Sequence, residues 1–255
     1  MSALEVIPAT TRFRGIKLMV VAAALYLALR LAGFHKFFAN DADGVGALLQ
    51  IVGTLYSVIY AFATYVIWGQ FAAVENEIQK ESGALKNLIL FSRQLKEAAR
   101  DPIVRAVKAY ARGVVESEWG MLSRGEDVER TEKLFAAVIS GVTELKPEDE
   151  QQRGTYEQLL DILHQASTHR DERIALSVKR IPRTILFFVT LTAFTVLFLL
   201  LFYPFHNLGL GLVSIAVTAM LLYFANFVLT DLDNPFEGTW NAESTPFSDL
   251  ITKYR

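Results

Sequence analysis

The sequence predicts an all-α membrane protein with four transmembrane helices, arranged as two hairpins with a helical domain inserted between them. Four strongly apolar stretches come in two pairs: residues 16–34 and 45–71, then residues 184–203 and 208–230. Each stretch is long enough to cross a hydrocarbon core of about 30 Å, which takes roughly 20 helical residues. About 110 mostly polar residues separate the two pairs, so we expect this middle region to fold outside the bilayer.

The first apolar stretch is interpreted as an uncleaved span. Arg12, Arg14 and Lys17 precede it, as basic residues precede a signal peptide. However, the stretch is longer than the apolar region of an ordinary signal peptide, and no clear small-x-small cleavage site follows it. The first hairpin is therefore expected to cover residues 16–71 and the second to cover residues 183–230.

The distribution of Lys and Arg predicts the orientation of the spans. Basic residues flank one side of the predicted membrane, namely Arg12, Arg14, Lys17, Lys80, Lys179, Arg180 and Arg183, whereas the other side has Lys36 and Arg30. Because cytoplasmic loops carry the excess of Lys and Arg, the segment 1–15, the domain 72–182 and the segment 231–255 should all be cytoplasmic. We expect a multi-pass protein of the inner (plasma) membrane with both termini in the cytoplasm.

The middle domain is predicted to be helical. Apolar side chains recur with a period near 3.6 over residues 74–98, and Asp101-Pro102 is a typical helix start. Further helices are expected over residues 102–122, 127–145 and 148–181, with Pro147 ending one of them. No alternation of the kind typical of strands occurs in the sequence.

A stripe of mainly small or polar residues follows the second span. Its members are spaced alternately by four and three residues: Gln50, Thr54, Ser57, Ala61, Thr64, Trp68 and Phe71. Such positions share one helix face, and polar groups are costly against lipid, so the stripe should face protein or water. One interpretation is helix packing, because Gly53, Ser57 and Ala61 form a small-xxx-small series. The other is a pore lining that narrows at Trp68 and Phe71.

Two further polar residues within the spans each have two interpretations. Arg30, near the outer end of the first span, either extends toward the lipid headgroups or contributes to a positive ring at an outer mouth. Asn226, in the fourth span, either forms an interhelical hydrogen bond or lies on a permeation path.

Composition and motifs exclude several classes of function. A formal net charge of −2 indicates no nucleic-acid partner, and the absence of cysteine excludes disulfides, thiol catalysis and cysteine metal sites. His164 and His169 are five residues apart, a poor spacing for one helix face, so we expect no metal site. Glu116 and Glu118 are acidic, but no nucleophile or histidine lies at catalytic spacing and no Walker loop occurs, so we expect no enzyme. Glu118-Trp119 is interpreted as a packing element, with the carboxylate paired to an arginine and the indole N–H hydrogen bonded.

The segment after the fourth span, Asp231-Leu232-Asp233-Asn234-Pro235-Phe236-Glu237-Gly238, ends the helix at its proline. Two carboxylates at a helix C-terminus are unfavourable for the helix dipole, so Asp231 and Asp233 should have a basic partner or a bound cation. This segment resembles the signature of the bestrophin-like domain family. Glu75 and the pair Glu118-Trp119 also match the family, and the resemblance covers residues 45 to 250.

The resemblance implies that copies of this chain assemble, with five subunits in bestrophins, into an anion channel in the lipid bilayer, lined by the second span. Bestrophins also bind calcium through an acidic run after this motif, but Thr239-Trp240-Asn241-Ala242 follows here. We therefore expect no cofactor, and expect Asp231 and Asp233 to pair with a basic residue of the middle domain. The hypothesis is a homo-oligomeric channel for small inorganic ions, favouring anions. The alternative is a non-conducting scaffold or signalling protein whose cytoplasmic domain binds a partner.

Overall fold

The computed structural model describes residues 8–126 and 128–254, and every regular element within these ranges is a helix. Residues 1–7 of the predicted N-terminal segment, and Arg255, lie outside the described residues. The chain divides into two compact units. The first unit comprises the residues up to Trp68 together with Arg180–Asp233, and the second comprises Gly69–Lys179 together with the residues from Asn234 onward.

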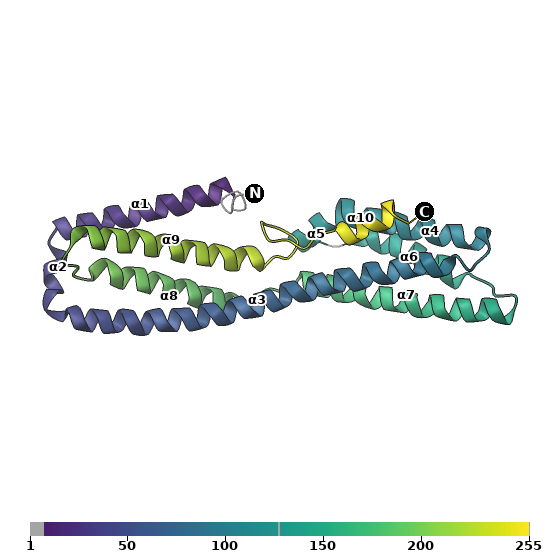
Figure 1. Cartoon of the computed structure of the whole chain (residues 1–255), viewed down its shortest axis with the longest axis horizontal. Coiled ribbons are helices and arrows are strands. Elements are labelled where there is room, and N and C mark those ends of the chain that lie inside the picture. The colour runs from purple at the N-terminus through teal and green to yellow at the C-terminus, as the bar shows by residue number, and fades with distance from the viewer. Residues whose placement is uncertain (1–7, 127, 255) are drawn as a thin grey trace. The chain divides into compact units, whose positions relative to one another are not determined.

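The first unit is built from long apolar helices. It contains α1 (Ala9–Leu31), α2 (Phe34–Phe37), η1 (Ala39–Asp41), the first part of α3 (Ala42–Ser92), α8 (Arg183–Phe202) and α9 (Leu208–Leu232). Helix α1 runs along α9, and α9 also packs on α8 (Figure 1). The buried side chains of this packing are Ala22, Tyr26, Leu200, Ile215 and Ala219.

Three helices of the described chain are long and apolar enough to cross a membrane: the helical stretch Ala39–Ser92, α8 and α9. Helix α1 is not among them. It extends from Ala9 to Leu31 instead of over residues 16–34, and carries Arg12 and Arg30 near its two ends. Gly33, with φ of 83°, follows α1 in the left-handed conformation that ends helices. The crossing of α1, and with it the four-span arrangement, stays a prediction from the sequence.

The contact between α1 and α9 depends on a glycine. A Cβ atom built on Gly211 of α9 would overlap the phenol oxygen of Tyr26. Tyr26 is almost completely buried, at 1% exposure, so its ring has little room to move. Gly211 therefore lets α1 approach α9 closely, as small residues do between membrane helices.

The second unit is a helical domain with its own core. It contains the later part of α3, α4 (Glu97–Gly113), the π-helical turn η2 (Val114–Glu118), α5 (Trp119–Arg124), α6 (Glu129–Thr143), α7 (Glu150–Ser177) and α10 (Thr245–Thr252). All of these elements contribute apolar side chains to one core. Helix α5 contributes Leu122 and η2 contributes Val114. Asp149 caps α7 by accepting a hydrogen bond from the backbone N–H of Gln152 at 2.7 Å.

Helix bounds in this unit differ from the sequence expectation, since the helix expected over residues 74–98 ends at Ser92. Helix α4 begins at Glu97 rather than at residue 102, so Pro102 lies inside it. Lys96 has φ −58° and ψ 149°, outside the helical region, and α4 begins after it. Pro102 has no N–H to donate to the carbonyl of Ala98, so the helix lacks that one backbone hydrogen bond. From Asn234 onward the C-terminal segment belongs to this unit, where α10 packs on α4.

Candidate functional site

The polar stripe of α3 is largely uncovered within the single chain. Its members Gln50, Thr54, Ser57 and Ala61 are exposed, and Thr64 is partly buried. The flank of α3 about a quarter turn from the stripe is exposed too, since Ile51 and Val58 have exposed fractions of 64% and 63%, whereas Ala63 and Ile67, on the far side of the helix, are buried. Packing inside this chain therefore does not account for the polar character of the stripe up to Ala61. Its partner must be another chain, lipid or water.

The hydroxyl groups of the stripe are hydrogen bonded within the helix. Thr54 donates to the carbonyl of Gln50 at 2.8 Å, and Ser57 donates to the carbonyl of Gly53 at 2.9 Å. Thr64 makes the same kind of bond to the carbonyl of residue 60. Each hydroxyl hydrogen thus has an acceptor, while the oxygen keeps a lone pair for water or a neighbour. A helix can carry such groups at low energetic cost.

The aromatic end of the stripe divides into two environments. Trp68 is 49% exposed, whereas Phe71 is 6% exposed. A buried ring does not line an open path in the single chain, so Phe71 differs from the other candidates that the spacing selects. Glu75, which the family resemblance singles out, is exposed one turn further along α3.

Arg30 neither extends freely to headgroups nor points to open space in this chain. Its guanidinium donates hydrogen bonds to the carbonyls of Phe205 and His206, in the turn between α8 and α9, and to the phenol oxygen of Tyr26. Arginine suits this position because its fork of N–H donors can serve several carbonyl groups at once. Arg30 therefore fastens α1 to the turn of the second predicted hairpin.

Asn226 bonds to a neighbouring helix. Its side-chain oxygen accepts a hydrogen bond from the hydroxyl of Thr190 on α8 at 3.3 Å, and its amide donates to the carbonyl of Leu222 at 3.0 Å. Of the two interpretations, the structure places Asn226 in the interhelical hydrogen bond.

The carboxylate of Asp233 serves the start of α8. It accepts a hydrogen bond from the backbone N–H of Ile181 at 2.8 Å, just before that helix begins. Burial raises the pKa of Asp233, and the Ile181 bond and the charge of Arg180 oppose that rise. The charge that is unfavourable at the end of α9 is thus placed at the beginning of α8, where the dipole has the opposite sign. Arg180 is the basic residue whose charge acts on Asp233, and the basic partner expected for Asp231 stays a prediction.

A buried ion-pair network occupies the second unit. Arg173 of α7 lies 2.6 Å from Glu81 (Nε to Oε2) and 2.6 Å from Glu118 (Nη2 to Oε1), and all three side chains are fully buried. Tyr110 donates to Glu81 and lies 3.3 Å from Arg173. The two carboxylates, together with Tyr110, raise the pKa of Arg173 well above its ordinary value although burial acts to lower it. The arginine therefore stays charged and links α3, α4, η2 and α7.

The Glu118-Trp119 pair has the contacts expected of a packing element. Glu118 is paired to Arg173, and the indole N–H of Trp119 donates to the carbonyl of Ala242 at 3.0 Å. The guanidinium of Arg173 lies 5.7 Å from the centre of the Trp119 ring. Because Glu118 is completely buried in this network, it is not accessible to a substrate. Glu118 is the last residue of the π-helical turn η2, and Trp119 is the first residue of α5.

The family-motif residues after α9 attach the C-terminal segment to the same domain. Asn234 donates to the carbonyl of Ser123 at 3.0 Å and Phe236 packs edge-on against Trp119, with ring centres 5.2 Å apart. The carbonyl of Pro235 accepts a hydrogen bond from the N–H of Ala242 at 2.7 Å. Gly238 has φ of 95°, which favours glycine. The motif is therefore a turn that positions α10 in the second unit.

One group of side chains that converge in the structure is not predicted by residue spacing in the sequence. Glu77 of α3 and His169 with Glu172 of α7 present ligand atoms that lie within 4.8 Å of one another. Glu77 and His169 are 92 residues apart, so no local spacing relates them. The only sequence signal was the His-x-x-Glu spacing on one helix, which is common without a metal.

Together these observations define an all-helical membrane-type chain in which long apolar helices are joined to a helical domain with a buried ionic core. The chain belongs to the Bestrophin-like domain family, whose signature matches residues 17–247. Two solved structures of a bacterial bestrophin homologue from Klebsiella pneumoniae, each with one substitution, share the fold. They are 13% and 12% identical, with TM-scores of 0.72 and 0.73, and each match covers 94% of this chain and 97% of that chain. No curated protein matches the sequence.

Proposed function

We propose that this protein is a homo-oligomeric ion channel of the plasma membrane, in which α3 of each copy lines the pore. The observation that carries the proposal is the stripe Gln50, Thr54, Ser57, Ala61 and Thr64, which is polar or small and mostly exposed in the single chain. Around a symmetry axis, copies of this stripe would face a water-filled path. Membership of the Bestrophin-like family supports the same conclusion, because bestrophins proper are channels.

The proposed pore narrows at Trp68. This ring is half exposed and continues the helical spacing of the stripe, so copies of it would form an apolar ring that can exclude water. Phe71 is left out of the proposed lining because it is buried within its own chain. The lining from Gln50 to Trp68 contains no ionisable side chain. A preference for anions is therefore inferred from the resemblance to bestrophins rather than from a ring of fixed charge.

In the proposed topology all four long helices α1, α3, α8 and α9 cross the membrane, with both termini cytoplasmic. Helices α3, α8 and α9 have the length and composition that a crossing needs. The close packing of α1 along α9 supports a crossing by α1, since α9 is strongly apolar. The basic residues at the start of α1 and before α8 support the orientation.

Purified protein in planar bilayers tests the proposal. The oligomer mass is measured first, and currents are then recorded across a KCl gradient, where the sign of the reversal potential reports whether chloride or potassium carries the current. Thr54→Leu and Ser57→Leu should reduce conductance without loss of assembly, because each places an apolar branched side chain on the polar stripe. Val58→Leu is the matched control, since it enlarges an exposed side chain about a quarter turn away from the stripe on α3.

The outcomes separate the channel from a non-conducting scaffold. A confirmed oligomer that carries no current above background over a wide voltage range would favour the scaffold or signalling function. Equal effects of Ser57→Leu and Val58→Leu on conductance would show that the stripe is not the lining. For the channel we expect all three variants to assemble, and we expect only Thr54→Leu and Ser57→Leu to lose current.

A further inference from the structure

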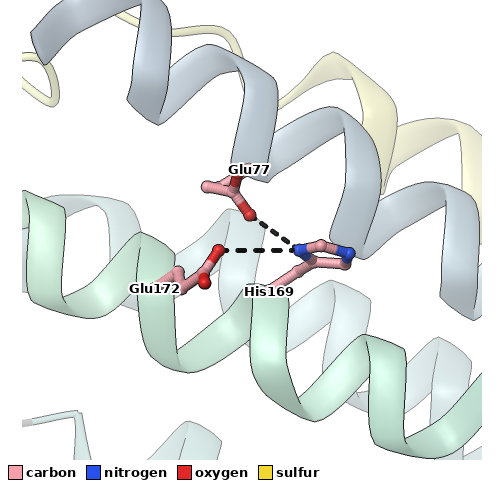
Figure 2. A group of neighbouring side chains, drawn as sticks. All are labelled: Glu77, His169 and Glu172. Carbon is pink, nitrogen blue, oxygen red and sulfur yellow. Dashed lines mark hydrogen bonds and ion pairs between the residues drawn. The ribbon is translucent and has the colours of Figure 1, made fainter.

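The side chains of Glu77, His169 and Glu172 converge on one point between α3 and α7 (Figure 2). The Nδ1 atom of His169 lies 2.7 Å from Oε2 of Glu77 and 3.8 Å from Oε2 of Glu172. Both carboxylates thus face the same ring nitrogen, and they come from two different helices of the second unit.

A hydrogen bond alone accounts for only part of this arrangement. A single Nδ1–H can be donated to Glu77, but the 3.8 Å distance to Glu172 is too long for a hydrogen bond. The second carboxylate then faces the first across less than 5 Å, with both groups acidic. Two like charges this close are unfavourable unless a cation or a shared proton lies between them.

Lys80 forms an ion pair with one carboxylate oxygen of Glu77, and the other oxygen faces His169. Its ammonium lies 2.9 Å from Oε1, whereas Oε2 is the oxygen that faces His169. The Lys80 contact therefore holds the carboxylate of Glu77 in place, as outer partners hold the ligands of metal sites.

We propose that Glu77, His169 and Glu172 bind a divalent transition-metal ion such as Zn²⁺. One imidazole nitrogen and two carboxylate oxygens suit zinc and its neighbours, whereas calcium takes oxygen ligands only. With metal–ligand bonds of about 2.0–2.2 Å, ligand atoms of a tetrahedral site are about 3.4 Å apart, and the two measured distances lie on either side of this value. A water molecule would complete the coordination.

The site is accessible from one side. Glu172 has a side-chain exposure of 55% and His169 of 22%, while Glu77, at 8%, forms the floor. An ion can therefore enter past Glu172. Once bound it would connect the cytoplasmic part of α3 to α7, whether or not the protein conducts, so this inference does not rest on the proposed channel.

The test uses the full chain in detergent, stripped of metal with a chelator. Co²⁺ is added first, because its visible absorption reports coordination by nitrogen and oxygen ligands, and Zn²⁺ is then used to displace it. We expect saturation at one Co²⁺ per chain and displacement by Zn²⁺. Loss of an outer partner alone weakens metal sites about 10–100-fold, so His169→Ala and Glu77→Gln should weaken binding by at least about tenfold.

His164→Ala is the matched control, because His164 is an exposed histidine on the same helix α7 outside the cluster. If His164→Ala weakens Co²⁺ binding as much as His169→Ala, or if the unmodified chain gives no saturable spectrum, the site does not exist. Glu172→Gln covers the case in which the other variants fail to fold, since Glu172 is half exposed. Folded Glu172→Gln protein that keeps the unmodified affinity and spectrum would also overturn the proposal.

Discussion

Arg173 and Glu118 form an ion pair of 2.6 Å in which neither side chain has any exposed surface. Glu81 contacts the same guanidinium from α3, so one arginine compensates two buried carboxylates. Buried pairs are poor substitutes for apolar packing, but removing one partner leaves a charge with no compensation. The network therefore makes correct docking of α7 against α3 and η2 a condition for a stable domain.

Replacing Arg173 by Met should strongly destabilise the second unit. The substitution leaves Glu81 and Glu118 buried without a cation, for which a loss of about 3–5 kcal/mol in the free energy of unfolding is expected. Denaturant unfolding in detergent, followed by circular dichroism, measures this loss. Lys133→Met is the control, because Lys133 pairs with Glu129 on the exposed surface and should matter little. Similar stability of the two variants would contradict the structural role of the network.

Trp119→Phe should release the C-terminal segment. The substitution keeps an aromatic ring but removes the N–H donor to Ala242, leaving that carbonyl without its partner at a cost of about 1 kcal/mol. Amide hydrogen exchange should increase in α10, which follows Ala242. Trp240→Phe serves for comparison because Trp240 is 45% exposed. Unchanged exchange in α10 would show that the indole bond does not hold the segment.

Gly211→Ala should loosen α1 from α9. The added methyl group overlaps the phenol of the buried Tyr26, and overpacking of this kind typically costs about 1–3 kcal/mol. The displacement would also disturb the hydrogen bond between Tyr26 and Arg30. Thermal unfolding in detergent measures the effect. Gly44→Ala, where a Cβ has open space within a helix, should not lower the midpoint, and an equal drop in both variants would argue against the close approach.

Asp233→Asn should alter the pH dependence of stability. Since burial raises the pKa of Asp233 in the folded chain, folding favours the protonated acid. The stabilising contribution is complete below about pH 3.9, the ordinary value of an aspartate, and is lost as the pH rises through the higher folded pKa. Asparagine has no such titration and can still accept the bond from Ile181 through its side-chain oxygen.

The expected result is that Asp233→Asn gains stability relative to the original chain as the pH rises from acid to neutral. Unfolding midpoints of both proteins across that range provide the measurement. A stability difference that is independent of pH, or that falls with rising pH, would show that the carboxylate is not penalised by its surroundings.

Local pattern was enough to predict much of the helical architecture. Three signals each depend on residues close together in the sequence, so they can be read without the tertiary structure. They are the apolar lengths of α3, α8 and α9, the 3.6-residue period of the middle domain and the proline after α9. The Asp231–Gly238 motif correctly indicated the family. The predicted start of α4 was wrong, because α4 begins at Glu97, directly after the non-helical backbone of Lys96, and Pro102 lies inside the helix rather than in its first turn.

Pairing between distant segments was decided only by the tertiary structure. Glu81 meets Arg173, and Glu77 meets His169, across 92 residues, and Trp119 meets Ala242 across 123 residues. Hydrophobic periodicity says which face of each helix is buried, but not which helix covers it. The sequence by itself therefore determined the helices, their membrane character and the family. Packing of α3, α7 and the C-terminal segment decided which charges are compensated and where Glu77, His169 and Glu172 converge.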